Sequence, residues 1–196
     1  MVRMEIDSAA FEAWECEPST IGFELVKLRD LIGLAEAGDL IEMNYDENDG
    51  RVNIQVGEIN RTIRPLDRAT MLEPRVPDVK LNSSVKLSAL KFSRALRAAK
   101  QVGDLATISL NAQSFGVNVS GDTDTVNVSY DAGELQDLSC PDGPVKSQYS
   151  LSLLFPMAKR IEAIVDTVTL FFNENHPLRL EFDFADGAGR CVYFLA

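Results

Sequence analysis

The stretch Tyr149-Ser-Leu-Ser-Leu-Leu154 opens a predicted helix, and predicted strands follow it from Thr167 onward. The same order occurs earlier in the chain, where Phe23-Glu-Leu-Val-Lys-Leu28 leads into a predicted helix and strands begin at Leu40. The two stretches lie 126 residues apart, counted from Phe23 to Tyr149. Because a solenoid repeats every 20–50 residues or so, this spacing indicates two homologous domains. Chance is the alternative explanation, since a helix followed by a strand meander is common.

Outward from these stretches, the sequence predicts three helices among short antiparallel strands. The helices span residues 26–37, 88–102 and 152–164. The strands span residues 40–45, 51–56, 58–65, 105–110, 115–119, 125–130, 167–172, 178–184 and 190–195. Asp49-Gly50 predicts a hairpin with a Gly-containing turn between the first two. Strand runs separated by isolated helices are typical of an α+β fold in which antiparallel sheets pack on helices. The copies are unequal, because the first lacks the opening strand, helix and strand that residues 84–196 provide.

A segment with two prolines separates the copies. Pro74 and Pro77 disfavour both helix and central strand, so residues 67–83 are interpreted as an extended connector. The predicted domains are therefore residues 1–66 and residues 84–196. The connector also carries Met71, Leu72 and Val76, and taken alone these apolar side chains are best explained by local packing.

Composition excludes several classes of protein. No stretch approaches the ~20 apolar residues of a membrane span, and the first residues lack the apolar run of a signal peptide. Cys16, Cys140 and Cys191 are far apart and form no CxxC or Cys/His cluster, which argues against a disulfide framework and against a zinc site. No cofactor motif is present. The net charge of −11 argues at first against nucleic acid.

The predicted helix over residues 88–102 reverses that charge locally. At about 100° per residue, its apolar side chains fall on one arc: Phe92, Ala95, Leu96, Ala99 and Val102. Its basic side chains fall on the opposite arc: Lys91, Arg94, Arg97 and Lys100. No acidic residue occurs between Asp78 and Asp104, although acids outnumber bases 30 to 19 in the chain. A solvated face usually mixes signs, so this single-signed face favours contact with phosphates.

The remaining basic residues give weaker signals, and the pattern as a whole favours duplex DNA. Lys159 and Arg160 lie on the third predicted helix and Lys27 and Arg29 on the first, each pair diluted by nearby acids. Aromatic residues do not alternate with the bases, so stacking on single strands is not indicated. Helix-turn-helix and zinc-finger spacings are absent from the sequence. The pattern suits sequence-independent contact with a duplex backbone.

Several motifs, in order along the chain, resemble archaeal DNA sliding clamps of the PCNA family. They are Phe11-Glu-Ala-Trp-Glu-Cys-Glu17, Ile21-Gly-Phe-Glu-Leu25, Phe92-Ser-Arg-Ala-Leu-Arg97, Gly103-Asp104, Pro177-Leu-Arg-Leu-Glu-Phe182 and Tyr193-Phe-Leu-Ala196. Gly121-Asp-Thr-Asp124 is similar to a turn common in haloarchaeal members. The resemblance spans essentially the whole chain, and no single motif carries it.

This resemblance implies the α+β DNA-clamp (processivity) fold and a ring-shaped homotrimer that encircles duplex DNA without sequence specificity. Such a ring tethers DNA polymerase as a processivity factor, is placed by a clamp loader, and binds ligase and nucleases through PCNA-interacting peptides. The resemblance implies no catalytic residue, cofactor, metal or membrane. It also implies a cytoplasmic, nucleoid-associated protein.

The resemblance assigns three sets of residues. Arg94, Arg97 and Lys159 match DNA-facing positions, Lys86, Lys91 and Lys100 extend that surface by position, and Arg160, Lys27 and Arg29 complete the DNA-binding set. The implied partner-peptide pocket is formed by Met71, Leu72, Val76, Pro77, Pro177, Phe194, Leu195 and Ala196. The implied subunit interface joins Asn60, Arg61, Thr62, Ile63 and Arg64 of one chain to Thr125, Val126, Asn127, Val128, Ser129 and Tyr130 of the next.

Departures from the family keep two alternatives open. The opening strand, the first inner helix and the next strand are not found, relatives continue beyond Ala196, and Pro156 stands early in the third helix. One alternative is a clamp-derived interaction module that binds partner peptides without closing a ring. The other is an enzyme, which the sequence disfavours because His176 is the single histidine and no phosphate loop or G-x-S-x-G motif occurs.

Overall fold

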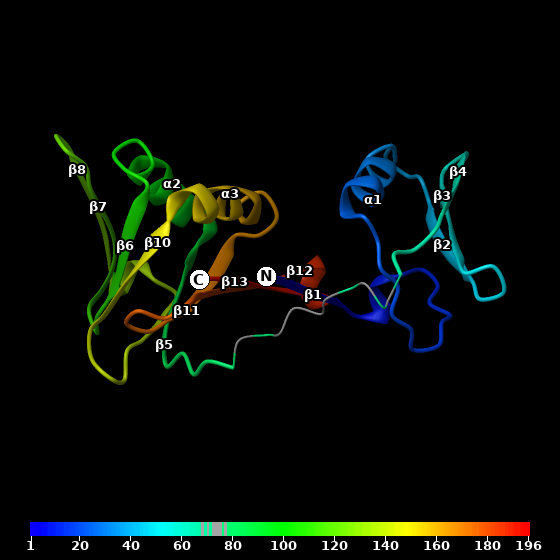
Figure 1. The fold of residues 1–196 in the computed structure, drawn as a ribbon. Coiled ribbons are helices and arrows are strands. Elements are labelled where there is room, and N and C mark those ends of the chain that lie inside the picture. The colour runs from blue at the N-terminus through cyan, green and yellow to red at the C-terminus, as the bar shows by residue number, and fades with distance from the viewer. Residues whose placement is uncertain (68, 70, 72–75, 77) are drawn as a thin grey trace. The chain divides into compact units, whose positions relative to one another are not determined.

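The computed structural model describes residues 1–196 except 68, 70, 72–75 and 77. The chain forms two compact units. Unit 1 combines Met1–Trp14 with Val76–Ala196, and unit 2 comprises Glu15–Arg75. Figure 1 shows α2 and α3 in unit 1 and α1 with its strands in unit 2. Among the described residues, no helix is long and apolar enough to cross a membrane.

Unit 1 contains two sheets and two α-helices in its described residues. Its helices are α2 (Ala89–Ala99) and α3 (Leu151–Ile161). Its strands are β1 (Val2–Ile6), β5 (Ser83–Ser88), β6 (Leu105–Leu110), β7 (Ser114–Ser120), β8 (Thr125–Asp131), β9 (Asp137–Ser139), β10 (Val145–Ser150), β11 (Thr167–Phe172), β12 (Leu178–Phe184) and β13 (Gly189–Leu195). Short 3₁₀ turns occur at η1 (Ser8–Ala10), η3 (Ala132–Glu134) and η4 (Ala185–Gly187). All named strand pairs are antiparallel, in the orders β1-β13-β12-β11-β5-β9 and β10-β6-β7-β8.

The core of unit 1 lies between these sheets and the helix pair, which lies side by side in Figure 1. Every second residue of a strand, such as Val85 and Leu87 on β5, points to the helix side of the sheet and is buried there. The apolar stripes of both helices, including Phe92 on α2 and Leu154 on α3, are fully buried against them. The helices therefore expose only the faces that point away from the sheets.

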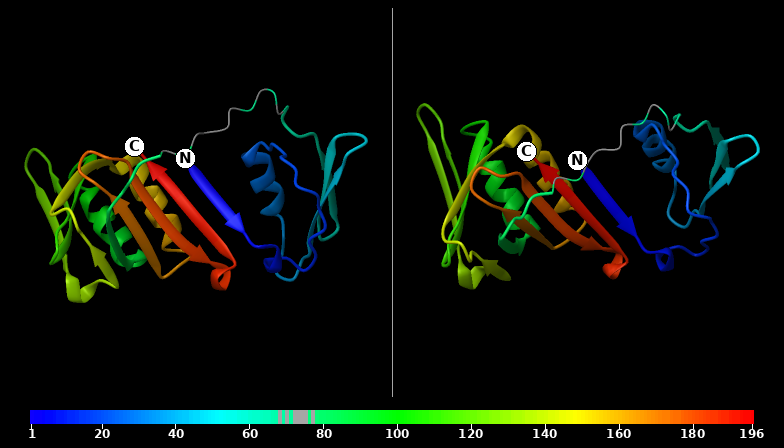
Figure 2. Two further views of the ribbon diagram at one scale, coloured as in Figure 1. Left: turned by 90° about the horizontal axis from the view of Figure 1, so that it is seen from below. Right: turned by 60° about the horizontal axis from the view of Figure 1, so that its bottom comes forward.

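The amino-terminal strand β1 belongs to unit 1 because it pairs with β13, with Val2 opposite Tyr193 and Ile6 opposite Gly189. Figure 2 shows β1 in blue beside β13 in red. This grouping differs from the predicted domain of residues 1–66, which places the same strand with unit 2. The sequence signal in this segment is a short alternation of polar and apolar residues, which says nothing about the pairing partner.

Unit 2 contains α1 (Leu25–Ile32) and a three-stranded sheet of β2 (Ile41–Asp46), β3 (Arg51–Val56) and β4 (Ile59–Ile63). Leu31 of α1 packs with the inward residues Val52, Ile54 and Val56 of β3. The β2–β3 turn is the Gly-containing turn that the sequence predicts, and Gly50 adopts φ +65 there, a conformation that favours glycine.

The predicted α+β arrangement, with antiparallel sheets and helices, is confirmed in the described residues. The first and last residues of several helices and strands differ from the predicted ones. α2 starts one residue late because Ser88 caps it, accepting a hydrogen bond from the Lys91 backbone N–H at 3.4 Å. α1 ends at Ile32, before Gly33. Among the described strands, the prediction omits β1, β9 and β10, and it contains β5 only as the opening strand of residues 84–196, without bounds.

Candidate nucleic-acid interface

Helix α2 presents two chemically opposite faces. Phe92, Leu96 and Ala99 are buried in the core of unit 1. The four basic side chains that the helical spacing predicts on the other face are all exposed: Lys91, Arg94, Arg97 and Lys100. Because the buried face fixes the rotation of the helix on the sheets, the basic face is held toward solvent.

Two of the four bases on α2 are already paired with carboxylates. Lys91 Nζ lies 3.2 Å from Glu134 Oε1, and Lys100 Nζ lies 2.9 Å from Asp104 Oδ1. The hydrogen bond from the Asp131 backbone, followed by Lys91, lowers the pKa of Glu134. The hydrogen bond and charge of Lys100 lower the pKa of Asp104. Both acids are therefore ionised at neutral pH and partly neutralise their lysines.

Arg94 and Arg97 differ, since neither forms an ion pair with any residue that the structure describes. Their guanidinium groups are exposed on the face of α2 away from the core. A guanidinium offers a planar fork of donors that matches phosphate oxygens. These two arginines are thus the strongest candidates for phosphate contact on this helix.

Tyr130 fixes β8 to the amino-terminal turn of α2. Its hydroxyl donates a hydrogen bond to the Lys91 backbone carbonyl at 2.9 Å, and Lys91 Nζ lies 5.5 Å from its ring centroid. Burial raises the pKa of Tyr130, so the hydroxyl stays protonated and keeps donating. Its ring also stacks on Phe115, with the centroids 6.4 Å apart. These contacts therefore join the edge strand β8 to the basic helix α2.

Helix α3 adds two more exposed bases beside α2. Lys159 and Arg160 lie in its last turn and form no ion pair within the described part of the chain. Cations at a helix carboxyl end are favoured by the helix dipole alone, so their position has an ordinary structural explanation too. Because α2 and α3 pack together, their basic residues nevertheless belong to one helical layer.

The structure corrects the placement of Lys86. Val85 and Leu87 of β5 point to the helices and are buried, so Lys86 between them points to the opposite face of the sheet. There it lines a hollow with Thr169 and Glu181. The expectation that Lys86 extends the basic surface of α2 is therefore wrong in geometry.

The bases of α1 lie in unit 2 and are neutralised locally. Lys27 Nζ lies 2.6 Å from Glu24 Oε1, and Arg29 Nη2 lies 2.6 Å from Asp30 Oδ1. These exposed pairs leave little uncompensated positive charge on α1. Glu24 and Asp30 are the nearby acidic residues that weaken the sequence-based prediction of a basic face on α1.

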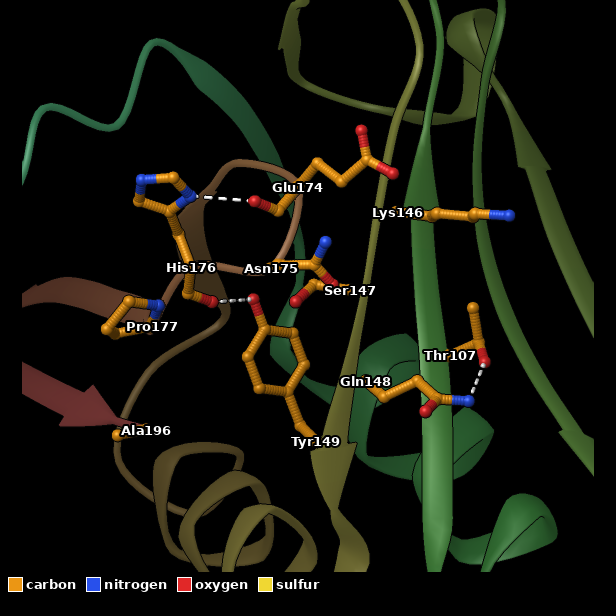
Figure 3. Close-up of a pocket in the computed structure, with 10 residues that line it drawn as sticks. All are labelled: Thr107, Lys146, Ser147, Gln148, Tyr149, Glu174, Asn175, His176, Pro177 and Ala196. Carbon is orange, nitrogen blue, oxygen red and sulfur yellow. Dashed lines mark hydrogen bonds between the residues drawn. The ribbon is translucent and has the colours of Figure 1, made fainter.

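Part of the predicted partner pocket lies in a hollow of about 540 Å³ on unit 1 (Figure 3). Pro177 and Ala196 line it, together with polar residues that the sequence analysis did not assign to the pocket: Thr107, Lys146, Ser147, Gln148, Tyr149, Glu174, Asn175 and His176. The Tyr149 hydroxyl donates to the His176 carbonyl at 2.9 Å and ties β10 to the β11–β12 turn. Burial raises the pKa of this tyrosine, which therefore remains a donor.

The other predicted pocket residues do not lie together in one hollow. Phe194 and Val76 line a second hollow of about 230 Å³ with Val192 and Arg179. Leu195 is 6% exposed and packs into the core, so its assignment to the pocket surface is corrected. Met71 lies in unit 2. Leu72 and Pro77 lie outside the described residues.

Both predicted interface segments coincide with edge strands in the described sheets. β4 contains Asn60, Arg61, Thr62 and Ile63 and ends the order β2-β3-β4, and Arg64 follows it directly. β8 contains Thr125 to Tyr130 and ends the order β10-β6-β7-β8. Each strand therefore presents one row of backbone groups that could pair with another chain.

Comparison with known proteins identifies the family. Residues 75–196, more than half of the chain, match the family "Proliferating cell nuclear antigen, C-terminal domain". The DNA polymerase sliding clamp of Natronomonas pharaonis is 33% identical, and the match covers 100% of this chain and 79% of that protein. The chain belongs to the PCNA family.

Other PCNA relatives agree with this assignment. The DNA polymerase sliding clamp of Methanosarcina mazei is 34% identical, over 98% of this chain and 78% of that protein. The structure of A. fulgidus PCNA bound to the C-terminal region of FEN-1 superposes with a TM-score of 0.89 at 23% identity, covering 100% of this chain and 79% of that one. PCNA from Thermococcus kodakaraensis gives a TM-score of 0.85 at 21% identity, covering 100% and 80%.

The family resemblance and the clamp fold that the sequence predicts are thereby confirmed. The PCNA match begins at residue 75, next to Val76, where the second segment of unit 1 begins. No group of three or more His, Cys, Asp or Glu among the described residues is arranged to hold a metal ion. The residue-level assignments to DNA, partners and interface stay predictions.

Proposed function

We propose that this chain is a subunit of a DNA sliding clamp, which encircles duplex DNA without sequence specificity and tethers DNA polymerase as a processivity factor. The observation that carries the proposal is the exposed, single-signed face of α2, with Arg94 and Arg97 unpaired among the described residues. In a chain of net charge −11, an exposed face that carries only positive charge favours binding of a polyanion. The matches to relatives named DNA polymerase sliding clamp support this function.

The proposed DNA-facing surface is narrower than the set that the resemblance implies. Arg94 and Arg97 of α2, with Lys159 and Arg160 of α3, contact phosphates. Lys91 and Lys100 contribute less, because Glu134 and Asp104 already pair with them. Lys86, Lys27 and Arg29 do not belong to this surface. Contacts to phosphates without base-edge readout position a protein on DNA of any sequence.

Ring closure follows from edge pairing. β13, the last strand of the second copy, pairs antiparallel with β1. β4 ends the first copy as β13 ends the second, and β8 precedes Tyr149 much as β1 precedes Phe23. Pairing β4 of one subunit with β8 of the next therefore repeats a junction that exists within unit 1. A closed homotrimer removes both open edges.

A ring also accounts for the acidic composition. Phosphate contacts weaken steeply with salt, and at about 1 M the screening length is only ~3 Å. A topological link retains DNA without tight contacts, so a few unpaired arginines suffice. The proposal places the protein at the nucleoid, in the cytoplasm, with no catalytic residue of its own.

Partner proteins dock on unit 1 beside Pro177, Phe194 and Ala196. The proposed occupants are peptide segments of the clamp loader, DNA polymerase, ligase and nucleases. The relative from A. fulgidus is bound to the C-terminal region of FEN-1, which supports docking of a chain terminus. The polar hollow at Tyr149 and His176 offers hydrogen-bond partners, and the hollow at Val76 and Phe194 offers apolar contact.

The double substitution Arg94→Glu and Arg97→Glu tests the DNA surface. We expect weaker binding to a random-sequence duplex, a shallower dependence of log K on log salt, and loss of clamp-dependent primer extension. Lys86→Glu is the control for position, since it makes the charge change of one of these two substitutions on the opposite face of the sheet. A loss from Lys86→Glu as large as the loss per substitution in the double variant would refute the assignment.

A clamp-derived module that binds peptides without closing a ring is the second candidate. Unit 2 favours it, because several large apolar side chains of β2 and α1 are exposed and stable assembly needs a well-packed subunit. Mass measurement by light scattering in high salt separates the two. A mass of about three times 21.6 kDa supports the ring, whereas a persistent monomer favours the module.

A further inference from the structure

The side-chain amide of Asn173 holds the carboxyl end of the connector, the segment predicted over residues 67–83. Its Oδ1 accepts hydrogen bonds from the backbone N–H groups of Asn82 at 3.2 Å and Ser83 at 3.3 Å. Its Nδ2 donates to the Lys80 carbonyl at 2.9 Å. Because two donors face the oxygen and one acceptor faces the nitrogen, the surroundings fix the orientation of this amide.

The position of Asn173 explains why a side chain is needed there. The pairing of β11 with β5 ends at Phe172 opposite Ser83, and Asn173 is the next residue. Lys80 and Asn82 lie outside the named strands. Backbone polar groups need partners where regular pairing stops, and the amide of Asn173 provides them. It thus extends the bonding of the sheet back into the connector as far as Lys80.

A second contact holds the same end of the connector from another side. The Asn82 side-chain Nδ2 donates to Asp142 Oδ2 at 2.8 Å. Asp142 lies in the turn between β9 and β10. Ser83, the next residue, is completely buried. The connector therefore joins unit 1 at a defined place, between two turns.

The turn that begins at Asn173 also forms part of the proposed peptide site. The His176 backbone N–H donates to the Asn173 carbonyl at 3.3 Å, and the Tyr149 hydroxyl donates to the His176 carbonyl at 2.9 Å. Pro177, the next residue, lines the hollow of about 540 Å³ with Ala196 (Figure 3). One turn, residues 173–177, thus holds the connector at its first residue and lines the hollow at its last.

We propose that Asn173 is a positioning residue for partner docking: it orders the connector end beside the hollow before a peptide arrives. An ordered site binds more tightly because less conformational freedom is lost on binding. This role rests on the peptide docking proposed above and does not involve the basic face of α2. Asn173 acts through the connector and the turn, and needs no contact with the peptide itself.

Asn173→Ala tests this role, with the C-terminal region of A. fulgidus FEN-1 as a labelled peptide probe. The substitution removes all three hydrogen bonds of the side chain. We expect affinity for the probe, measured by fluorescence anisotropy, to fall at least about fivefold. Hydrogen exchange at the amides of Asn82 and Ser83 should become faster, because their shared acceptor is lost. Asn173→Asp keeps an acceptor and loses the donor to Lys80, so its affinity should lie between the two.

Asn111 provides a matched control in the turn between β6 and β7. Its Oδ1 accepts from the backbone N–H groups of Gln113 at 2.8 Å and Ser114 at 3.0 Å, and its Nδ2 donates to Ser114 Oγ at 3.0 Å. Asn111→Ala therefore loses the same number of hydrogen bonds, all within its own turn. Its urea midpoint should fall about as much as that of Asn173→Ala, while its affinity for the probe stays at the parent value.

Three results would overturn the proposal, and they have different meanings. Unchanged affinity in Asn173→Ala overturns the role of Asn173 and leaves peptide docking intact. Equal weakening in Asn111→Ala also overturns it, because lost stability then explains the effect. If the parent chain does not bind the probe at all, peptide docking itself fails and the role of Asn173 fails with it.

Discussion

The two copies of the helix-and-meander pattern differ in what surrounds them. α3 buries Leu151 and Leu154 completely, because α2 and two sheets enclose it. α1, built on the same pattern, fully buries only Leu31. A hydrophobic stripe therefore indicates a face that needs covering, and the neighbour decides whether it becomes core.

The largest expected effect comes from making the same substitution in both copies. Leu151→Ala removes a fully buried side chain and should lower the free energy of unfolding of unit 1 by about 2–5 kcal/mol. Leu25→Ala removes an exposed side chain and should change the free energy of unfolding of unit 2 by less than about 0.5 kcal/mol. Urea unfolding followed by circular dichroism measures both.

Equal losses in the two variants would contradict the comparison, because they would mean that Leu25 is buried in solution.

Much of the fold could be predicted from sequence, and the misses share a cause. Long periodic segments such as residues 88–102 and the Asp49-Gly50 turn contain their own signals, which explains why they were predicted. β9 has three residues and β1 five, and each is held by strands far away in sequence, Lys86 opposite Asp137 and Val2 opposite Tyr193. Pairing partners at such separation are not encoded in a local pattern.

The sequence alone predicts that α2 has an exposed basic face, but it does not predict every ion pair and position of the basic residues. Helical spacing alone exposes Arg94 and Arg97. The pairing of Lys100 with Asp104 was foreseeable at four residues, whereas Glu134 reaches Lys91 from 43 residues away. Lys86 was misplaced although Val85 and Leu87 on either side of it signal an opposite face. The alternation of a strand, once the strand is recognised, would have corrected this.

The second prediction compares the bases of α1 with those of α2. Arg94→Glu with Arg97→Glu should weaken binding to duplex DNA at least about tenfold at moderate salt, since every phosphate that is no longer neutralised reduces the salt slope by ~0.9. Lys27→Glu with Arg29→Glu should change it far less, because Glu24 and Asp30 already neutralise these residues. Fluorescence anisotropy across a salt series measures both. A larger loss from the α1 pair would reverse the assignment.

The third prediction concerns the attachment of β8 to α2 through Tyr130. Tyr130→Phe removes the hydrogen bond to the Lys91 carbonyl and keeps the ring on Phe115. The free energy of unfolding of unit 1 should fall by about 1 kcal/mol. An unchanged urea midpoint would show that the hydroxyl bonds to water instead.

The smallest expected effect separates paired from unpaired bases within α2 itself. Glu134→Gln removes the carboxylate beside Lys91, so that this lysine becomes as available as Arg94. Affinity for duplex DNA should rise roughly threefold, with a steeper salt dependence. Glu12→Gln makes the same charge change at an exposed residue in unit 1 and serves as the control for net charge.

The pH dependence of that effect gives an independent check. Because the Asp131 backbone and Lys91 lower the pKa of Glu134, its carboxylate stays ionised as pH falls and protonates only below the usual range for a glutamate. The affinity difference between Glu134→Gln and the parent chain should therefore be constant from about pH 8 to 6 and disappear only in more acidic buffer, where the parent also loses the charge. A difference that fades within that neutral range would mean that another group controls Lys91, and the division of α2 into paired and free bases would have to be redrawn.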